Sequence, residues 1–123
     1  MKKIFSTNAP AAIGPYSQAM VVGNLVYTSG QIPINPASGE IEAKDIEAQT
    51  EQVCKNLDAV LIAAGASLTT GVKTTCFLAE IADFAAFNAV YAEYFVSMPA
   101  RSCVAAKDLP KGALCEVEVI AKK

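Results

Sequence analysis

The chain has 123 residues, of which 53% are hydrophobic and 18% charged, and this length and apolar content suit one packed domain, residues 1–123. Its net charge is -2, its lysines are scattered apart from the terminal pairs, and no apolar run approaches about 18 residues, so we expect a cytoplasmic protein that binds neither nucleic acid nor a membrane. Histidine is absent, which excludes a Ser-His or Cys-His nucleophile pair and a His-ligated metal centre within the chain.

The first elements along the chain are a predicted hairpin and a loop. Ala19–Val22 and Leu25–Ser29 are short runs rich in residues that favour strands. Gly23-Asn24 between them is typical of a tight hairpin turn. The segment Pro33–Gly39, with two prolines and a glycine, predicts a loop.

Two segments predict helices. Apolar residues recur at helical spacing over Ile46–Ala64, where Asp45 can cap the start and Gly65 can end the helix. A second helix is expected over Phe84–Phe95, with Asp83 as the candidate N-cap. Its aromatic residues form a stripe, which favours burial against a sheet over a cofactor site: Phe84, Phe87, Tyr91, Tyr94 and Phe95.

Three more strands complete the predicted fold. They are Val72–Ala79, Arg101–Ala106 and Leu114–Ala121, and Pro110–Gly112 is expected to turn the last two back on each other. The order β-β-α-β-α-β-β predicts an α+β sandwich, with one mixed sheet and both helices packed on the same face. The other face would offer apolar residues to neighbouring subunits: Val21, Val26, Phe77 and Ile120.

Arg101 is the only arginine and starts a strand two residues after Pro99. Its planar fork of donors suits two-point binding of the carboxylate of a small 2-oxo, 2-imino or 2-amino acid. A structural ion pair with Glu116 or Glu118 explains it about equally well, since an antiparallel pairing of the last two strands could set Arg101 beside these glutamates. The residues alone leave both interpretations open.

Several motifs, in this order, resemble the RidA (YjgF) family almost end to end. They are Ala9–Ala19, Thr28–Pro33, Val72–Thr75, Phe87–Tyr91, Pro99–Ser102 and Leu109–Leu114. The resemblance implies a chorismate-mutase-like α+β fold and a homotrimer whose sheets form a central barrel, with sites in the clefts between subunits. It also implies hydrolysis of reactive 2-imino and 2-enamino acids, such as 2-aminoacrylate and 2-aminocrotonate, to 2-oxo acids and ammonia, without a metal or organic cofactor.

The family's site residues are all present. Carried over residue by residue, the catalytic positions are Arg101, Glu116, Tyr16 and Cys103, and the substrate-binding positions add Ser29, Gly30 and Asn88. In the implied roles, Arg101 neutralises the substrate carboxylate, Glu116 deprotonates a water, and Tyr16 donates a hydrogen bond or proton. The choice of Glu116 over Glu118 as the base rests on the resemblance alone.

The four cysteines, Cys54, Cys76, Cys103 and Cys115, have no Cys-x-x-Cys spacing, and we expect buried free thiols. Cys103 is not expected to be a nucleophile because no histidine can activate it, although Arg101 nearby could lower its pKa. The chain departs from many relatives in the short stretch Val96–Met98 before Arg101. The resemblance therefore does not predict the shape of the cleft rim.

Two other functions remain open. A non-catalytic trimer could sense 2-oxo acids through Arg101, and it would share the whole site without needing Glu116 as a base. A ribonuclease or translation inhibitor is disfavoured, because the chain lacks histidine, a basic stripe and an interleaved aromatic platform.

Overall fold

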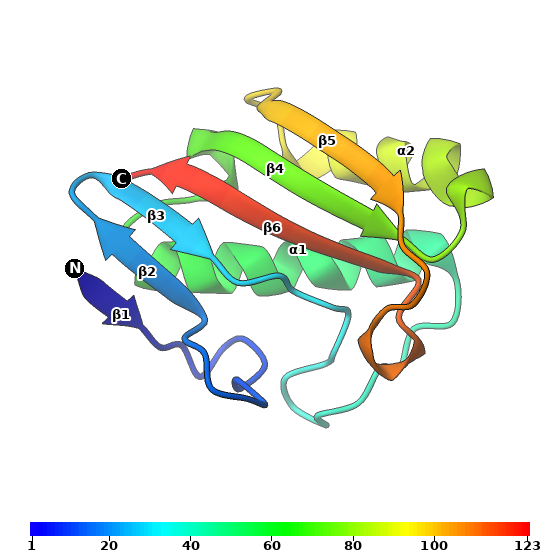
Figure 1. Ribbon diagram of the computed structural model, residues 1–123, viewed down its shortest axis with the longest axis horizontal. Helices are drawn as coiled ribbons and strands as arrows, with labels where there is room; N and C mark the ends of the chain where they lie inside the picture. The colour runs from blue at the N-terminus through cyan, green and yellow to red at the C-terminus, as the bar shows by residue number, and fades with distance from the viewer.

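The computed structural model describes all residues, 1–123, as a six-stranded sheet and two helices (Figure 1). The strands are β1 (Lys2–Ile4), β2 (Ala19–Val22), β3 (Leu25–Thr28), β4 (Gly71–Leu78), β5 (Ala100–Ala105) and β6 (Cys115–Lys122). The helices are α1 (Ile46–Ala63) and α2 (Phe84–Tyr94). Neither helix is long and apolar enough to cross a membrane.

The sheet is mixed, as predicted, and its strand order is β1-β2-β3-β6-β4-β5. Only β4 and β5 are parallel, and every other neighbouring pair is antiparallel. The strand β1 was not predicted, because three residues that include Lys2 and Lys3 carry too weak a pattern to be recognised. The element order is therefore β-β-β-α-β-α-β-β.

The expected pairing of the last two strands with each other is wrong. The strand β4 lies between β5 and β6 and pairs with both, parallel to β5 and antiparallel to β6 (Figure 1). The physical reason is the connection through α2, since two strands joined by a helix that crosses the sheet run parallel and can lie side by side. The segment that contains the short 3-10 turn Pro110–Gly112 instead connects β5 to β6, which lies on the other side of β4.

The predicted helix ends agree with the structure for α1. The Asp45 side chain accepts a hydrogen bond of 2.7 Å from the backbone N–H of Ala48, and Gly65 follows the helix with a φ of +83°. Asp83 precedes α2, but its side chain makes no capping hydrogen bond. The 3-10 turn Ile81–Asp83 enters α2 directly, with the N–H of Phe84 donating to the carbonyl of Ile81.

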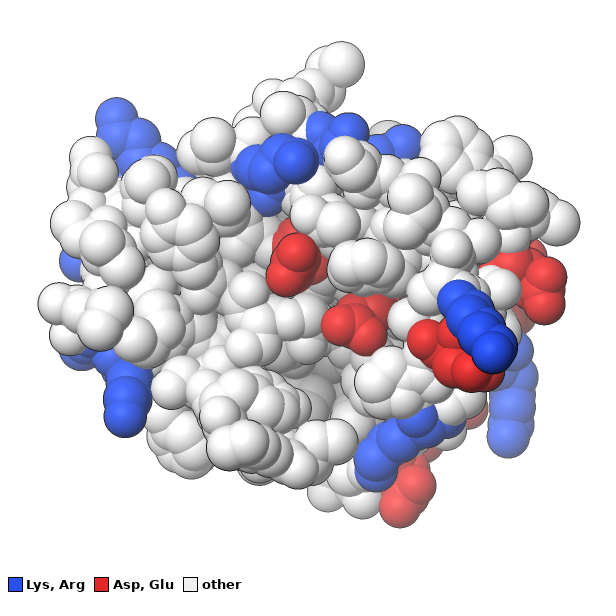
Figure 2. Space-filling view, viewed as in Figure 1, with Lys and Arg blue, Asp and Glu red and all other residues white.

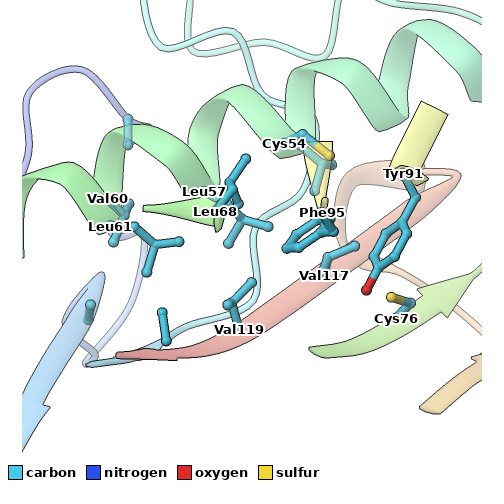
Figure 3. Close-up of a cluster of buried hydrophobic side chains, with 14 of the residues drawn as sticks. Cys54, Leu57, Val60, Leu61, Leu68, Cys76, Tyr91, Phe95, Val117 and Val119 are labelled. Carbon is cyan, nitrogen blue, oxygen red and sulfur yellow. The ribbon is translucent and has the colours of Figure 1, made fainter. Parts of the chain in front are cut away.

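Both helices cover the same face of the sheet, and the core lies between them. Leu57, Val60 and Leu61 of α1 lie over Val117 and Val119 of β6 (Figure 3). The aromatic stripe of α2 is buried only in part. Its members Phe87, Tyr91 and Phe95 belong to this core, whereas Phe84 is 38% exposed and Tyr94 is partly buried.

The opposite face of the sheet carries no helix. Alternation along the strands and the register place Phe77 beside Glu116 and Ile120 beside Lys73 on this open face. The expectation that Val21 and Val26 lie there is wrong. These two residues pair with each other and point to the helices, where they are 8% and 0% exposed.

We predict that Leu57→Ala lowers the free energy of unfolding by about 2–5 kcal/mol, because the side chain is fully buried and its removal leaves a cavity. The control is Ile62→Ala, on the same helix but 61% exposed, which should change it by no more than about 0.5 kcal/mol. Urea unfolding at one fixed protein concentration measures both. Equal costs for the two variants would contradict this assignment of the core.

Candidate functional site

Arg101 lies on β5 beneath α2, and three residues of that helix surround its guanidinium. Its Nη1 donates a hydrogen bond of 2.8 Å to the side-chain oxygen of Asn88. Its Cζ lies over two aromatic rings, 5.5 Å from the ring centroid of Phe84 and 4.8 Å from that of Tyr91. This contact gives Asn88, a poor helix former in mid-helix, a specific partner.

An open hollow of about 570 Å³ adjoins this guanidinium. Its apolar wall comes from the end of α2 and from the short stretch Val96–Met98, which therefore forms the rim of the hollow. Met98, whose N–H closes the turn by donating to the carbonyl of Phe95 at 3.1 Å, is 86% exposed and has a left-handed φ of +52°. The hydroxyl of Ser97 ties this turn to β4 by donating to the carbonyl of Gly71 at 3.1 Å.

The predicted site residues of the N-terminal half lie elsewhere, around Glu116 on the open face of the sheet. Tyr16, Ser29, Gly30, Glu116 and Glu118 all line a second hollow of about 500 Å³. Figure 2 shows acidic side chains near the middle of a face that is otherwise largely uncharged. The structure thus brings four of the predicted residues together with Glu118.

Gly30 lies directly against the Glu116 carboxylate. A backbone bridge holds this segment beside β6, since Gln31 and Val117 exchange two hydrogen bonds of 2.9 and 3.2 Å. A Cβ atom at position 30 would overlap a carboxylate oxygen of Glu116. A side chain at position 30 would therefore displace the Glu116 carboxylate from its present position.

The two hydroxyl groups near Glu116 have different hydrogen-bonding capacities left. Ser29 donates its proton to the carbonyl of Ser17 at 2.6 Å, so its oxygen can still accept. The Tyr16 hydroxyl accepts from the N–H of Ile13 at 3.3 Å, so its own proton is free to be donated. The hollow thus offers a ligand one donor, one acceptor and the carboxylates.

Partial burial raises the pKa of Glu116, and the neighbouring charge of Glu118 raises that pKa further. A carboxylate with a raised pKa holds a proton more strongly, which suits a group that must take a proton and then return it.

Cys103 shares the face of Arg101 and pairs in register with Cys76 of β4. Burial raises the pKa of Cys103, and the lowering effect of the Arg101 charge is smaller. Burial also raises the pKa of Cys76 to about 12. Both groups are therefore thiols rather than thiolates at neutral pH, and neither is activated as a nucleophile.

The predicted residues form two groups on opposite faces of the sheet. Arg101 pairs in register with Thr74, which points to the helices, whereas Glu116 pairs with Phe77 on the open face. The expectation that strand pairing sets Arg101 beside the glutamates is therefore wrong. We call Arg101, Asn88 and Cys103 the arginine half-site, and Tyr16, Ser29, Gly30 and Glu116 the glutamate half-site.

Sequence reasoning missed the contacts of Phe84 and Tyr91 with Arg101. It assigned both rings to the core stripe. The signal that could have found them is the spacing of Phe84, Asn88 and Tyr91, which lie four and three residues apart and so share one face of a helix.

The family described as "Endoribonuclease L-PSP" matches residues 6–123. The chain belongs to this family, the RidA (YjgF) family. A candidate regulator named AldR from Lactococcus lactis is 53% identical over 123 residues, covering 99% of this chain and 98% of the relative. A 2-iminobutanoate/2-iminopropanoate deaminase from Escherichia coli is 48% identical over 124 residues, covering 98% of this chain and 96% of the relative.

Solved structures of the RidA family share the fold. A Thermotoga maritima protein described as a candidate endoribonuclease matches with a TM-score of 0.96 and 48% identity, covering 100% of this chain and 98% of that one. Escherichia coli TdcF with bound serine matches with a TM-score of 0.94 and 42% identity, covering 100% and 99%. The predicted α+β fold of one mixed sheet and two helices is thus confirmed, whereas the names of the relatives span a regulator, a deaminase and an endoribonuclease.

We predict that Glu118→Gln lowers the pKa of Glu116, because it removes a like charge that disfavours the ionised form. Titration of the Glu116 side-chain carboxyl by carbon-13 NMR measures the shift. The matched control is Glu80→Gln, an exposed glutamate that does not contribute to the raised pKa of Glu116. An unchanged or raised pKa in Glu118→Gln would contradict the coupling of the two carboxylates.

Proposed function

We propose that this protein hydrolyses reactive 2-imino and 2-enamino acids to 2-oxo acids and ammonia, in sites formed between the subunits of a homotrimer. The observation that carries the proposal is the pair of half-sites, one with a ready carboxylate-binding guanidinium and one with a partly buried acid–base group. The Escherichia coli relative named as a 2-iminobutanoate/2-iminopropanoate deaminase supports the same reaction.

The arginine half-site suits the carboxylate of such a substrate. One Nη1 hydrogen bond is used by Asn88, and the remaining N–H groups of Arg101 are available to a ligand. A planar guanidinium binds a carboxylate through two parallel hydrogen bonds, which fixes the orientation of the neighbouring C=N group as well as the charge. Orientation of this kind accelerates a reaction because the reacting atoms are already aligned.

The glutamate half-site can supply the proton transfers. An enamino acid first tautomerises to the imine, whose protonated C=N carbon is already electrophilic, so attack by water needs no metal or organic cofactor. Glu116 takes a proton from the water as its oxygen bonds to this carbon, forming a tetrahedral amino alcohol. The same carboxyl returns the proton to the nitrogen and then takes the hydroxyl proton as the C–N bond breaks. The 2-oxo acid and ammonia leave, and Glu116 passes this last proton to ammonia or water.

The two hydroxyls fit this sequence of steps. Ser29 can accept a hydrogen bond from the N–H of the protonated imine, since its own proton is engaged with Ser17. Tyr16 can donate to the oxygen of the tetrahedral intermediate.

A partner copy is needed because the half-sites lie on opposite faces of one sheet. If the arginine half-site of one subunit contacts the glutamate half-site of the next, the interface is head-to-tail. Such an interface forms a ring when the rotation from one subunit to the next closes. A ring of three would turn the open faces toward a central barrel. This arrangement would also cover the apolar side chains there: Met20, Tyr27, Phe77, Val104 and Ile120.

A non-catalytic ligand-binding trimer is the second candidate, because a relative of 53% identity is named as a candidate regulator. Such a protein would bind 2-oxo acids through Arg101 without any need for a base. An endoribonuclease, the activity in the family description, would have to cleave RNA without histidine and with a net charge of -2.

We predict that the wild type accelerates 2-oxo acid formation from threonine or serine by a pyridoxal-phosphate dehydratase. Arg101→Ala should abolish this acceleration. Glu116→Gln should lower turnover by about 10²-fold or more, as loss of a general base does, while leaving the affinity for 2-oxobutanoate nearly unchanged. The assay follows the 2-oxo acid, and calorimetry measures the affinity. No acceleration by a wild type that still binds 2-oxobutanoate through Arg101 would favour the ligand-binding trimer.

The shared site predicts complementation between two inactive variants. In co-expressed Arg101→Ala and Glu116→Gln chains, about one quarter of the sites in a randomly mixed ring would combine an intact Arg101 with an intact Glu116. About one quarter of wild-type activity should therefore return. Each variant expressed alone is the control. Mixed rings without activity, or a light-scattering mass of one chain, would contradict sites formed between subunits.

A further inference from the structure

We propose that Phe84 and Tyr91 are positioning residues, which hold the Arg101 guanidinium in the orientation that receives the substrate carboxylate. The inference rests on the proposed function for the identity of the ligand. Both aromatic rings lie against the guanidinium, so the role proposed for them is exerted through Arg101. The sequence analysis assigned both rings to the core, and the predicted site residues do not include them.

The geometry places the guanidinium between the two rings. Its Cζ lies over the face of each, at 5.5 Å from the centroid of Phe84 and 4.8 Å from that of Tyr91. Residues seven apart on a helix are separated by about 10 Å along its axis, so a group this close to both rings lies between them. Asn88, between the two in sequence, holds Nη1 by a hydrogen bond of 2.8 Å.

Tyr91 is itself firmly held. Its hydroxyl shares a buried hydrogen bond of 2.7 Å with the Thr74 hydroxyl, and its ring stacks on Phe95 at a centroid distance of 4.3 Å. Figure 3 shows the ring standing on the helix with its oxygen directed toward the sheet near Cys76. The Tyr91 ring is therefore a rigid support for the arginine. Phe84, at the start of α2, forms the second, partly exposed side of this support; we call the two rings together the clamp.

This support leaves the ligand-binding edge of the guanidinium unblocked. Aromatic rings attract a cation through their faces, so they do not occupy the in-plane N–H donors that a carboxylate needs. A free arginine side chain loses rotamer entropy when it is fixed. Rings that restrict it beforehand reduce that loss when the substrate binds.

The single arginine makes the test direct, because a chain labelled with nitrogen-15 arginine gives one side-chain Nε signal. The test variant is Phe84→Leu, and the matched control is Phe5→Leu, the same change at an exposed position. We expect the Nε signal to move and its order parameter to fall in Phe84→Leu but not in Phe5→Leu. The KM for the imine should rise by about 2- to 30-fold, the range expected for a cation–π contact, with a smaller change in kcat.

Two further variants separate positioning from a general structural role. Phe84→Tyr retains the ring and should restore both the order parameter and KM. The double variant Tyr91→Phe with Thr74→Val keeps the ring but removes the hydroxyl pair, and it should lower the Arg101 order parameter while the ring-current shift persists. An Nε signal and KM in Phe84→Leu that equal those of the wild type would overturn the proposal.

Failure of the proposed function gives a different result. If the wild type shows no imine turnover, the Nε order parameter and the affinity for 2-oxobutanoate still report on the clamp. A loss of order and of affinity in Phe84→Leu alone would then support positioning in a non-catalytic binder. Unchanged values would overturn it there as well.

Discussion

Strict alternation of side chains along the strands is the constraint on which this site depends. Because neighbouring residues point to opposite faces, and because the register sets Arg101 beside Thr74 and Glu116 beside Phe77, the guanidinium faces the helices and the carboxylate faces the open side. No side-chain rotation brings them together through a hydrogen-bonded sheet. A ligand that needs both groups must therefore receive them from two copies of the chain.

The same separation keeps the two charges available. An arginine and a glutamate that met within one chain would form an ion pair and neutralise each other before the subunits assembled. Here Arg101 contacts the neutral amide of Asn88 and two rings, so it keeps its positive charge and its free donors. Glu116 lies near the like charge of Glu118, and this repulsion favours an opposite charge or a proton nearby.

Periodicity and turn chemistry predicted most of the fold because they are local. The hairpin turn at Gly23, the Asp45 cap and the end of α1 at Gly65 each depend on a few neighbouring residues, and the structure agrees with them. Strand order is a long-range property, so the sequence did not show that β4 separates β5 from β6. Because the register of the strands was also unknown from the sequence, Val26, a core residue, was assigned to the open face. The site residues came from a family resemblance, and their separation into half-sites needed the topology.

The helix α2 shows why an aromatic stripe is hard to interpret from sequence. Rings at helical spacing are required wherever a helix is buried, so the stripe alone favours core packing. On α2 the stripe is wider than the core it covers, and Phe84 extends beyond it to the edge strand β5. Since β5 ends the sheet, no further strand covers that side of the helix. The ring of Phe84 lies against β5, where the one cation is Arg101. At the edge of the sheet, a ring that belongs to the core pattern of α2 therefore supports Arg101, the proposed carboxylate-binding group.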